Sequence, residues 1–495
     1  MDKCNNVTMK YILSVDQGTT SSRAIIFDEN QKVIAESQRE YKLSYPKDGW
    51  VEANPRTILD TVKEVINEVL TTTGVKVACC GITNQRESVV VWNKHTGEEV
   101  YPAIIWQDRR TSEFCRSLAL KKPKFEKQLR QKTGLLLDPY FSATKIQWIL
   151  KNVSGAMKLA QKGDLCCGTI DSFLVWHLTE ENNHLTDVSN ASRTMLMDIR
   201  SCQWDQELLR EFDIPESMLP EIKNNDYNFG TIKSNHSFPI TGVIGDQQSA
   251  LFGQDCLSSG DMKITFGTGC FLMVNTLKEI VYSKSNLLTT VGYQIGSNKE
   301  STFSVEGSIY SAGSAIQWLR DGLKVFDNTK HSENFINSNF DSGGVKFVPA
   351  FTGLGAPHWN SSIRASFQGI QRDTSINDLV TSVFKSICFQ TREIVEALNI
   401  DGIEVNKYRV DGGMIKNNLF LQMLSDTLNK EIITPNFVES TALGAYKMAC
   451  VGSKISLEGQ KSYSITSPNQ ERVTFMDIDY KDWKKNLKNL ISIQD

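Results

Sequence analysis

The chain has 495 residues, with 54 lysines and arginines, 57 aspartates and glutamates, and a formal net charge of −3 at pH 7. A single hydrophobic core stops growing near about 250 to 300 residues, so this length predicts two or more domains. Apolar residues make up 40% of the chain and charged residues 22%, which is typical of a globular protein. The near balance of charge and the lack of a long basic run argue against nucleic acid as a partner.

No apolar segment of the sequence is long enough to span a bilayer, and residues 1–10 carry no apolar signal core before the first predicted strand. We therefore expect a cytoplasmic protein with no membrane insertion. The 11 cysteines are scattered without CxxC spacing, which favours buried, reduced thiols over a zinc site or disulfides.

The segment 11–27 (YILSVDQGTTSSRAIIF) is predicted to form a β-hairpin, because two apolar runs flank a turn that begins at Gly18. The turn gathers hydrogen-bond donors that suit phosphate oxygens, namely Thr19, Thr20, Ser21, Ser22 and Arg23. The carboxylate of Asp16 would repel a phosphate directly, so it would act through a bridging Mg²⁺. An ordinary polar turn is the alternative interpretation.

A third strand at 32–41, a helix and a buried strand are predicted after this hairpin. Asn54 and Pro55 suit the N-cap and first residue of the helix, and apolar residues then recur at helical spacing until Gly74. The apolar run 75–82 predicts the strand, and the polar residues 84–87 follow it. In open α/β sheets, binding residues collect at the carboxyl ends of strands.

The second half of the chain repeats this order. Residues 261–276 (DMKITFGTGCFLMVNT) again predict a strand, a Gly/Thr turn and a strand, 376–398 predict a helix, and 408–410 predict a strand. The repeat predicts an α/β fold of two duplicated actin-like ATPase (ribonuclease H-like) domains, with a phosphate chain gripped in the cleft between them. We place the boundary at Gln254, giving domains 1–254 and 255–495. Sugar kinases, actin and the 70-kDa chaperones share this architecture, so it does not choose among their functions.

Two other nucleotide-binding motifs are missing. The sequence has no GxxxxGK[ST], and its GxG pieces at 267–269 and 353–355 lack the third glycine of a dinucleotide fingerprint. A P-loop enzyme and a Rossmann dehydrogenase are therefore not expected.

Asp246 follows an apolar strand at the start of a predicted helix (VIGDQQSALFG). In a kinase, a carboxylate at this place can accept the proton of a substrate hydroxyl as that hydroxyl attacks the γ-phosphorus. The structural alternative is that Asp246 is only the N-cap of the helix.

Three further groups of residues suit a polyol and a nucleotide. Arg86 and Glu87 can donate to one hydroxyl and accept from another, although most such dipeptides are solvated surface pairs. Aromatic side chains can shield a carbon skeleton from water, although most are core residues: Trp106, Tyr140 and Phe271. The glycines of 411–413, with Asn417, would let adenine and ribose lie against the backbone, unless they form a plain tight turn.

A series of motifs keeps its order along nearly the whole chain: DQGTTSSRA (16–24), GWVE (49–52), GITNQRE (81–87), WQDRR (106–110), DPYFSATK (138–145), NASRTM (190–195), GDQQ (245–248), FGTGCF (266–271), AFTGLGAP (350–357) and VDGG (410–413). This series closely resembles the glycerol-phosphorylating members of the FGGY carbohydrate kinase family.

The resemblance implies transfer of the γ-phosphoryl group of ATP to glycerol, giving sn-glycerol 3-phosphate and ADP, with Mg²⁺. It assigns the general base to Asp246 and the metal to Asp16 and Asp246. The matching glycerol-binding residues are Arg86, Glu87, Trp106, Tyr140, Asp246, Gln247 and Phe271. The matching nucleotide-binding residues are Thr19, Thr20, Ser21, Arg23, Gly267, Thr268, Gly313, Gln317, Gly413 and Asn417.

One region departs from the family pattern. Some bacterial members bind a regulatory sugar bisphosphate through a Gly- and Arg-rich stretch, but the corresponding residues 233–239 (KSNHSFP) contain neither. The family commonly forms dimers or tetramers, so a homo-oligomer is expected. A related FGGY kinase acting on another sugar or polyol, and more remotely an actin-like ATPase switch, remain as alternatives.

Overall fold

The computed structural model describes residues 9–179, 183–233, 237–296, 300–435, 439–457 and 462–494. The chain divides into two compact units. Unit 1 comprises Met1–Gly253, Thr289–Phe303 and Ser440–Gln460, and unit 2 comprises Gln254–Leu288, Ser304–Glu439 and Lys461–Asp495. The expected division after Gln254 uses a single cut, whereas two later segments also belong to unit 1. The division into 1–254 and 255–495 is therefore kept as a proposal about which part of the chain carries which function.

Unit 1 is built on a six-stranded sheet in the order β13-β14-β5-β1-β2-β3. Its strands are β1 (Tyr11–Gln17), β2 (Ser21–Asp28), β3 (Val33–Glu40), β5 (Val77–Asn84), β13 (Gly230–Ile232) and β14 (Phe238–Gly245). Strand β5 runs parallel to both β1 and β14, and its last residue, Asn84, lies opposite Gln17 on one side and Gly245 on the other. The carboxyl ends of these three strands therefore meet at one edge of the sheet.

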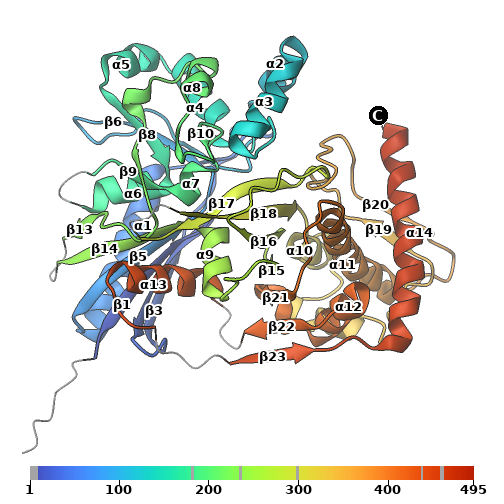
Figure 1. The fold of residues 1–495 in the computed structure, drawn as a ribbon. Helices are drawn as coiled ribbons and strands as arrows, with labels where there is room; N and C mark the ends of the chain where they lie inside the picture. Colours follow the sequence, from blue (N-terminus) through green and yellow to red (C-terminus); the bar gives the residue numbers. More distant parts are fainter. Residues whose placement is uncertain are drawn as a thin grey trace, which may run out of the picture. The chain divides into compact units, whose positions relative to one another are not determined.

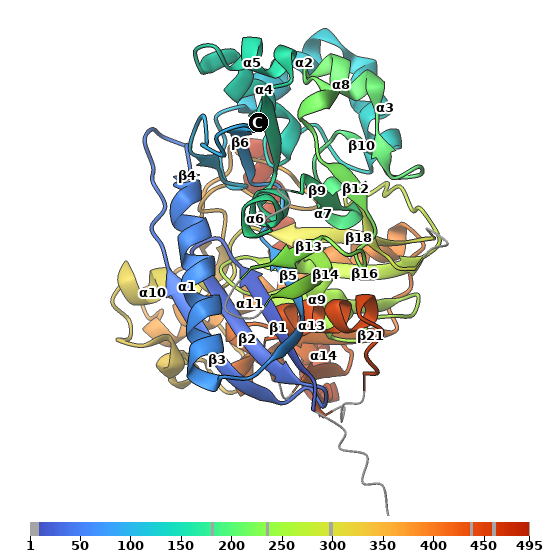
Figure 2. The ribbon, with the colours of Figure 1, turned by 90° about the vertical axis from the view of Figure 1, so that its left-hand side faces the viewer.

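Helix α1 (Pro55–Thr73) begins and ends where the sequence predicts. The Asn54 Oδ1 accepts a hydrogen bond from the Thr57 N–H at 3.1 Å, and Gly74 ends the helix at φ 63°. The apolar face of α1, with Ile58, Leu59, Val62 and Val65, is buried in the same hydrophobic core as the sheet residues. Figure 2 shows the helix lying across β1, β2 and β3.

Helices α9 (Asp246–Gly253) and α13 (Ser440–Gly452) pack side by side in unit 1, although they are far apart in the sequence (Figure 1). A Cβ atom on Gly444 would lie 1.9 Å from the Ser249 carbonyl oxygen, so only glycine permits this approach. The Ser14 hydroxyl of β1 also donates to the Ala442 carbonyl at 2.7 Å. Helix α13 therefore backs the strand that leads into the first turn.

The remaining elements of unit 1 include a four-stranded sheet in the order β4-β7-β6-β8 and two two-stranded sheets, β9 with β12 and β10 with β11. They are β4 (Glu52–Ala53), β6 (Val89–Asn93), β7 (Ala103–Ile104), α2 (Ser112–Lys121), α3 (Pro123–Thr133), α4 (Ser142–Asn152), α5 (Ala156–Lys162), β8 (Leu165–Thr169), α6 (Ile170–Leu178), β9 (Leu185–Asp187), α7 (Val188–Ala191), β10 (Met197–Asp198), β11 (Gln203–Trp204), α8 (Gln206–Glu211), β12 (Glu221–Lys223) and β17 (Leu288–Gln294).

Unit 2 repeats the plan of a hairpin beside a parallel strand. Six strands of its seven-stranded sheet run in the order β18-β16-β15-β21-β22-β23. They are β15 (Asp261–Phe266), β16 (Cys270–Leu277), β18 (Ser301–Ile309, mostly in unit 2), β21 (Lys407–Asp411), β22 (Ile432–Pro435) and β23 (Tyr463–Thr466). Strand β21 is parallel to β15 and places Asp411 opposite Thr265. The relation of β1, β2 and β5 in unit 1 is thus repeated, which confirms the predicted internal duplication.

Helices cover this second sheet. The longest of these helices share one apolar core with its strands. They are α10 (Gly313–Asp321), α11 (Ile376–Ile400), α12 (Asn418–Leu428) and α14 (Gln470–Gln494), with β19 (Lys346–Val348), β20 (Ser366–Gln368) and two 3₁₀ turns at Thr329–Phe335 and Gly413–Lys416. Helix α11 starts with a capping box, in which Ser375 and Asp378 bond to each other's backbone N–H. Its residues Val383, Ile387 and Ile394 are fully buried.

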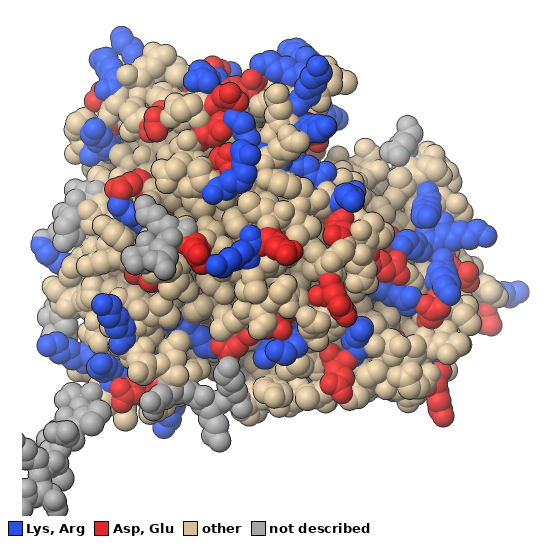
Figure 3. Space-filling view, viewed as in Figure 1, with Lys and Arg blue, Asp and Glu red and all other residues tan. Residues whose placement is uncertain are grey.

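Among the described residues, no helix combines the length and apolar character needed to cross a membrane. Ten cysteines are described, and all ten are free and buried. On the face shown in Figure 3, acidic and basic side chains are interspersed, as the near-balanced composition suggests. The region 233–239 that departs from the family pattern lies partly outside the described residues.

Candidate functional site

The turn of the first hairpin is closed by a backbone hydrogen bond. The Gly18 N–H donates to the Ser21 carbonyl at 2.8 Å, and Asp16 lies opposite Arg23 in the register of the antiparallel strands β1 and β2. Thr20 is exposed, while Thr19 and Ser21 are half-buried. The turn therefore presents hydroxyl and backbone groups at the carboxyl edge of the sheet, as a phosphate-binding loop requires.

A buried polar cluster, made of Gln17, Tyr41 and Gln85, supports this turn. The Tyr41 hydroxyl donates to the Gly18 carbonyl at 2.7 Å, and the Gln85 amide donates to the same carbonyl at 3.1 Å. Burial raises the pKa of Tyr41, so its hydroxyl stays a neutral donor at physiological pH. Sequence reasoning missed this cluster, because its three members are brought together only by the pairing of the strands.

Arg86 lies between two carboxylates at the end of β5. Its Nε is 3.1 Å from Asp246 Oδ1 and 3.9 Å from Glu87 Oε1, and its Nη1 donates to Gln248 Oε1 at 3.2 Å. Arg86 and Glu87 are almost fully buried, whereas the Asp246 side chain is 28% exposed. The surface-pair alternative for Arg86 and Glu87 is therefore wrong, because neither side chain is solvated.

Asp246 is the first residue of α9, and its Oδ1 also accepts from the Gln247 N–H at 2.7 Å. Part of the capping alternative is thus realised, since the carboxylate does contact the start of the helix. The same oxygen faces the buried guanidinium of Arg86, which a helix cap does not need. The arrangement gives Asp246 a fixed orientation beside a guanidinium.

Two aromatic rings lie next to these charges. Trp106 and Tyr140 meet edge to face, with ring centroids 5.7 Å apart, and Tyr140 is buried. The Trp106 indole N–H donates to Thr19 Oγ1 at 2.9 Å, which ties this aromatic pair to the phosphate turn. The aromatic wall and the polar turn, which were predicted separately, are therefore in direct contact.

Asp16 and Asp246 occupy the same edge of the sheet of unit 1. Asp16 lies in β1 and Asp246 follows β14, and only β5 separates these strands. Two interstrand spacings of about 4.8 Å place their backbones about 10 Å apart. Among the described residues, no group of three or more His, Cys, Asp or Glu side chains could hold a metal ion. One or two carboxylates are nonetheless the usual protein contribution to Mg²⁺ that bridges phosphates, so this pair fits that ion.

The second turn lies in unit 2 and is bound to the start of α10. The Gly313 N–H donates to the Gly267 carbonyl at 2.9 Å, and the Ser314 N–H donates to the Thr268 carbonyl at 3.0 Å. Gly267 and Thr268 are themselves exposed. The half-buried Phe271 follows on β16, where its carbonyl accepts from the buried Lys263 ammonium at 3.2 Å.

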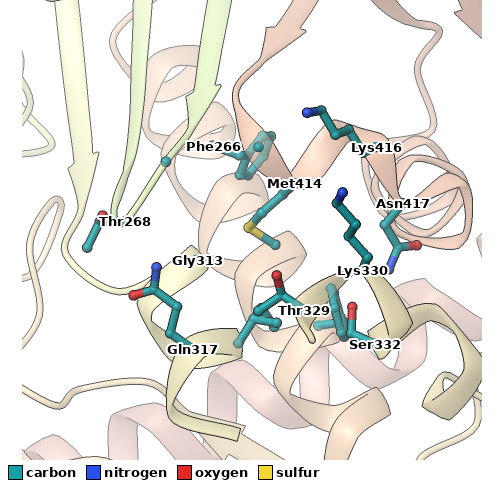
Figure 4. Close-up of a pocket in the computed structure, with 14 residues that line it drawn as sticks. Phe266, Thr268, Gly313, Gln317, Thr329, Lys330, Ser332, Met414, Lys416 and Asn417 are labelled. Carbon is teal, nitrogen blue, oxygen red and sulfur yellow. The ribbon is translucent and has the colours of Figure 1, made fainter. Parts of the chain in front are cut away.

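A cavity of about 530 Å³ opens beside this turn, entirely within unit 2. Figure 4 shows Thr268 and Gln317 on one side of it and Lys330, Lys416 and Asn417 on the other. Its lining includes all six predicted nucleotide-binding residues of this unit: Gly267, Thr268, Gly313, Gln317, Gly413 and Asn417. Sequence reasoning missed the other lining residues, which are Phe266, Ile316, Thr329, Lys330, Ser332, Phe384, Met414 and Lys416.

Asn417 has two separate roles in this cavity. Its Oδ1 accepts from the Phe420 N–H at 2.9 Å and caps α12, while its buried Nδ2 has no partner among the described residues. A buried amide without a partner is costly unless a ligand accepts from it. Gly413 adds free space, because nothing lies within 4 Å of the position that a Cβ would take. The pocket therefore fits a flat, hydrogen-bonding group such as a nucleobase.

The predicted residues thus fall into two sets, each gathered within one unit. Unit 1 holds Asp16, Thr19, Thr20, Ser21, Arg23, Arg86, Glu87, Trp106, Tyr140, Asp246 and Gln247, and unit 2 holds Gly267, Thr268, Phe271, Gly313, Gln317, Gly413 and Asn417.

Two family models cover most of the chain. The N-terminal domain of the FGGY family of carbohydrate kinases matches residues 11–253, and the C-terminal domain matches residues 262–453. The chain belongs to the FGGY family of carbohydrate kinases. The resemblance drawn from the motifs is confirmed.

Individual FGGY relatives extend this result. The chain is 48% identical over 446 residues to a glycerol kinase of Alteromonas mediterranea, covering 89% of this chain and 90% of that one. It is 47% identical over 448 residues to a glycerol kinase of Clostridium perfringens, covering 89% of each. The crystal structure of Plasmodium falciparum glycerol kinase with ADP superposes with a TM-score of 0.89 at 36% identity, covering 97% of this chain and 98% of that one. The expected two-domain, actin-like fold of the FGGY kinases is thereby confirmed.

Proposed function

We propose that this FGGY kinase transfers the γ-phosphoryl group of ATP to glycerol and releases sn-glycerol 3-phosphate and ADP. The observation that carries the proposal is the buried Arg86, which lies between Asp246 at 3.1 Å and Glu87 at 3.9 Å. One guanidinium and two carboxylates at a strand end form a donor and acceptor set for adjacent hydroxyls. The identity of 47 to 48% to glycerol kinases supports the same substrate.

In this mechanism Arg86 donates to one glycerol hydroxyl and Glu87 accepts from another, with Gln247 beside them. Trp106 and Tyr140 cover the carbon skeleton and exclude water, which is itself a competing acceptor. The terminal hydroxyl lies against Asp246, which accepts its proton as the oxygen attacks the γ-phosphorus. Because Arg86 orients the carboxylate, little rearrangement is needed at that moment.

Both turns contribute donors to ATP. Thr19, Thr20, Ser21 and Arg23 suit the phosphates from the first turn, and Gly267 and Thr268 from the second. The adenosine fits the cavity of about 530 Å³, whose size is usual for a ligand pocket and whose Asn417 amide requires an acceptor. When bound, Mg²⁺ would be held by Asp16 and Asp246 and would neutralise phosphate charge. In this proposal, domain 1–254 binds the polyol and carries the general base, and domain 255–495 binds the adenosine.

The first test is ADP release by purified protein with MgATP, measured with glycerol, with pentuloses and pentitols, and with no acceptor. We expect a large stimulation by glycerol alone. Stimulation by a sugar and not by glycerol would refute the substrate, and ADP release that ignores every acceptor would refute the kinase reaction itself.

A cytoplasmic location and a homo-oligomer, dimer or tetramer, belong to the same proposal. The ten described cysteines are all free and buried, which is the usual state of thiols in a reducing compartment. Light scattering of the purified protein tests the oligomeric state directly.

A further inference from the structure

Two fully buried basic side chains lie beside the polyol residues without belonging to the predicted site. They are Lys145 of α4, in the DPYFSATK motif, and Arg193, which follows α7 in the NASRTM motif. Lysine and arginine are rarely buried completely unless they are paired with other groups. Their partners therefore indicate what they hold in place.

Arg193 contacts the side chains of two polyol residues. Its Nε is 2.6 Å from Glu87 Oε1, which is a short, charge-assisted hydrogen bond. Its guanidinium carbon lies 5.8 Å from the centre of the Tyr140 ring and 5.3 Å from that of Phe141, within the range of cation–π attraction. One guanidinium thus orients both the carboxylate and the ring that are proposed to contact glycerol.

Lys145 contacts the backbone of the same two residues. Its Nζ donates to the Tyr140 carbonyl, to the Phe141 carbonyl at 3.3 Å and to the Glu87 carbonyl at 3.4 Å. The Ser142 hydroxyl also donates to the Glu87 carbonyl at 3.1 Å. Glu87 needs such support, because its φ of 59° lies in the left-handed region, where non-glycine residues are strained.

The charges in this region divide into pairs. Arg86 is nearer to Asp246, at 3.1 Å, than to Glu87, at 3.9 Å, while Arg193 is 2.6 Å from Glu87. A carboxylate that is 1% exposed needs a close cation, and Arg86 is already shared with Asp246. Arg193 therefore satisfies Glu87 and leaves Arg86 oriented toward the base.

We propose that Arg193 is a positioning residue for the polyol, acting through Glu87 and Tyr140, and that Lys145 fixes the backbone of the same pair. The inference rests on the proposed glycerol kinase activity and deepens it. Arg193 itself need not touch the substrate. It sets the direction in which the Glu87 carboxylate accepts a hydroxyl.

The test is a double-mutant cycle on kcat/KM for glycerol with Arg193→Gln, Glu87→Gln and the double variant. We expect Arg193→Gln to lower kcat/KM for glycerol by about a hundredfold, mostly through KM, while KM for ATP changes by less than about threefold. The double variant should be no worse than Glu87→Gln by more than about threefold, since the effect of Arg193 passes mainly through its bond to the Glu87 carboxylate. Arg193→Lys should recover part of the loss.

Arg200→Gln is the matched control, because it removes a guanidinium that pairs with Asp198 at the surface of the same unit. It should leave both KM values unchanged. Independent, additive losses from Arg193→Gln and Glu87→Gln, or an equal rise in KM for ATP, would overturn the inference. If Arg193→Gln does not fold, the cycle is run with Arg193→Lys. Failure of the wild-type protein to respond to glycerol would instead reject the proposed function.

Discussion

Replacing Asp246 with asparagine removes the proposed base and keeps the shape of the side chain. In Asp246→Asn the amide oxygen can still accept from Arg86 Nε, which lies 3.1 Å from Asp246 Oδ1. A positioned general base contributes about 10² to 10⁴ in rate, so we expect kcat to fall about a thousandfold, or about 4 kcal/mol of activation free energy. Binding of glycerol and ATP should change by less than about threefold.

The variant should also stay folded. With an effective dielectric constant of about 20, Arg86 has a gross attraction of about 5 kcal/mol to Asp246 and about 4 kcal/mol to Glu87, which is 3.9 Å away and remains. The Asp246 side chain is 28% exposed, so the net cost is smaller than for a fully buried pair. We expect the free energy of unfolding to drop by about 1 to 2 kcal/mol.

The assay couples ADP release to a spectroscopic readout, and calorimetry measures glycerol binding. Asp198→Asn is the control, since it makes the same isosteric change at a carboxylate that pairs with Arg200 at the surface. Near-normal turnover in Asp246→Asn, with the control also active, would remove Asp246 from the role of base. Loss of glycerol binding in parallel with turnover would assign Asp246 to substrate binding alone.

Three further predictions concern the nucleotide cavity and the buried lysine. Asn417→Asp keeps the oxygen that caps α12 but loses the Nδ2 donor, so KM for ATP should rise about tenfold while Tm stays within a few degrees; an unchanged KM would leave the amide only its capping role. Gly413→Ala should fold normally and raise KM for ATP, whereas Gly412→Ala should destabilise, because its φ is 95° and a Cβ would lie 2.3 Å from the Phe266 carbonyl oxygen; thermal melts compare the two. Burial lowers the pKa of Lys145 from 10.5 to about 7, so between those values the unfolded chain binds a proton that the folded chain has lost. The free energy of unfolding of wild type relative to Lys145→Met should therefore rise with pH, by at most about 1.4 kcal/mol per pH unit. Urea unfolding of both proteins at about pH 7 and about pH 9 measures this difference. No rise would mean that the buried lysine stays fully charged.

Local signals in the sequence predicted much of the fold. The Asn54 cap, the terminator Gly74 and the apolar spacing between them define α1, because capping and helical periodicity depend on residues only a few positions apart. The two Gly/Thr hairpins and their parallel strands were predicted for the same reason. The later segments of unit 1, including α13, carry no local sign of where they pack.

The candidate site was predicted as a set of residues but not as a set of contacts. Motifs identified Arg86, Glu87 and Asp246, yet the division of cations between the two carboxylates depends on distances that only the packed sheet decides. Arg193 lies in one of the motifs that carry the family resemblance. The sequence distance between Arg193 and Glu87, however, matches no helical or strand period, so it predicts no contact between them. Its role became visible only through the hydrogen bond between them.

By itself, the sequence determined the residue types that can bind phosphate and polyol, the elements that carry them, and the family to which the chain belongs. The tertiary structure decided which of these groups meet. Trp106 donates to Thr19 across 87 positions, and Arg193 donates to Glu87 across 106. Propensities, caps and turns act over a few residues, whereas the partner of a buried charge is chosen by strand order and register, which no local pattern encodes.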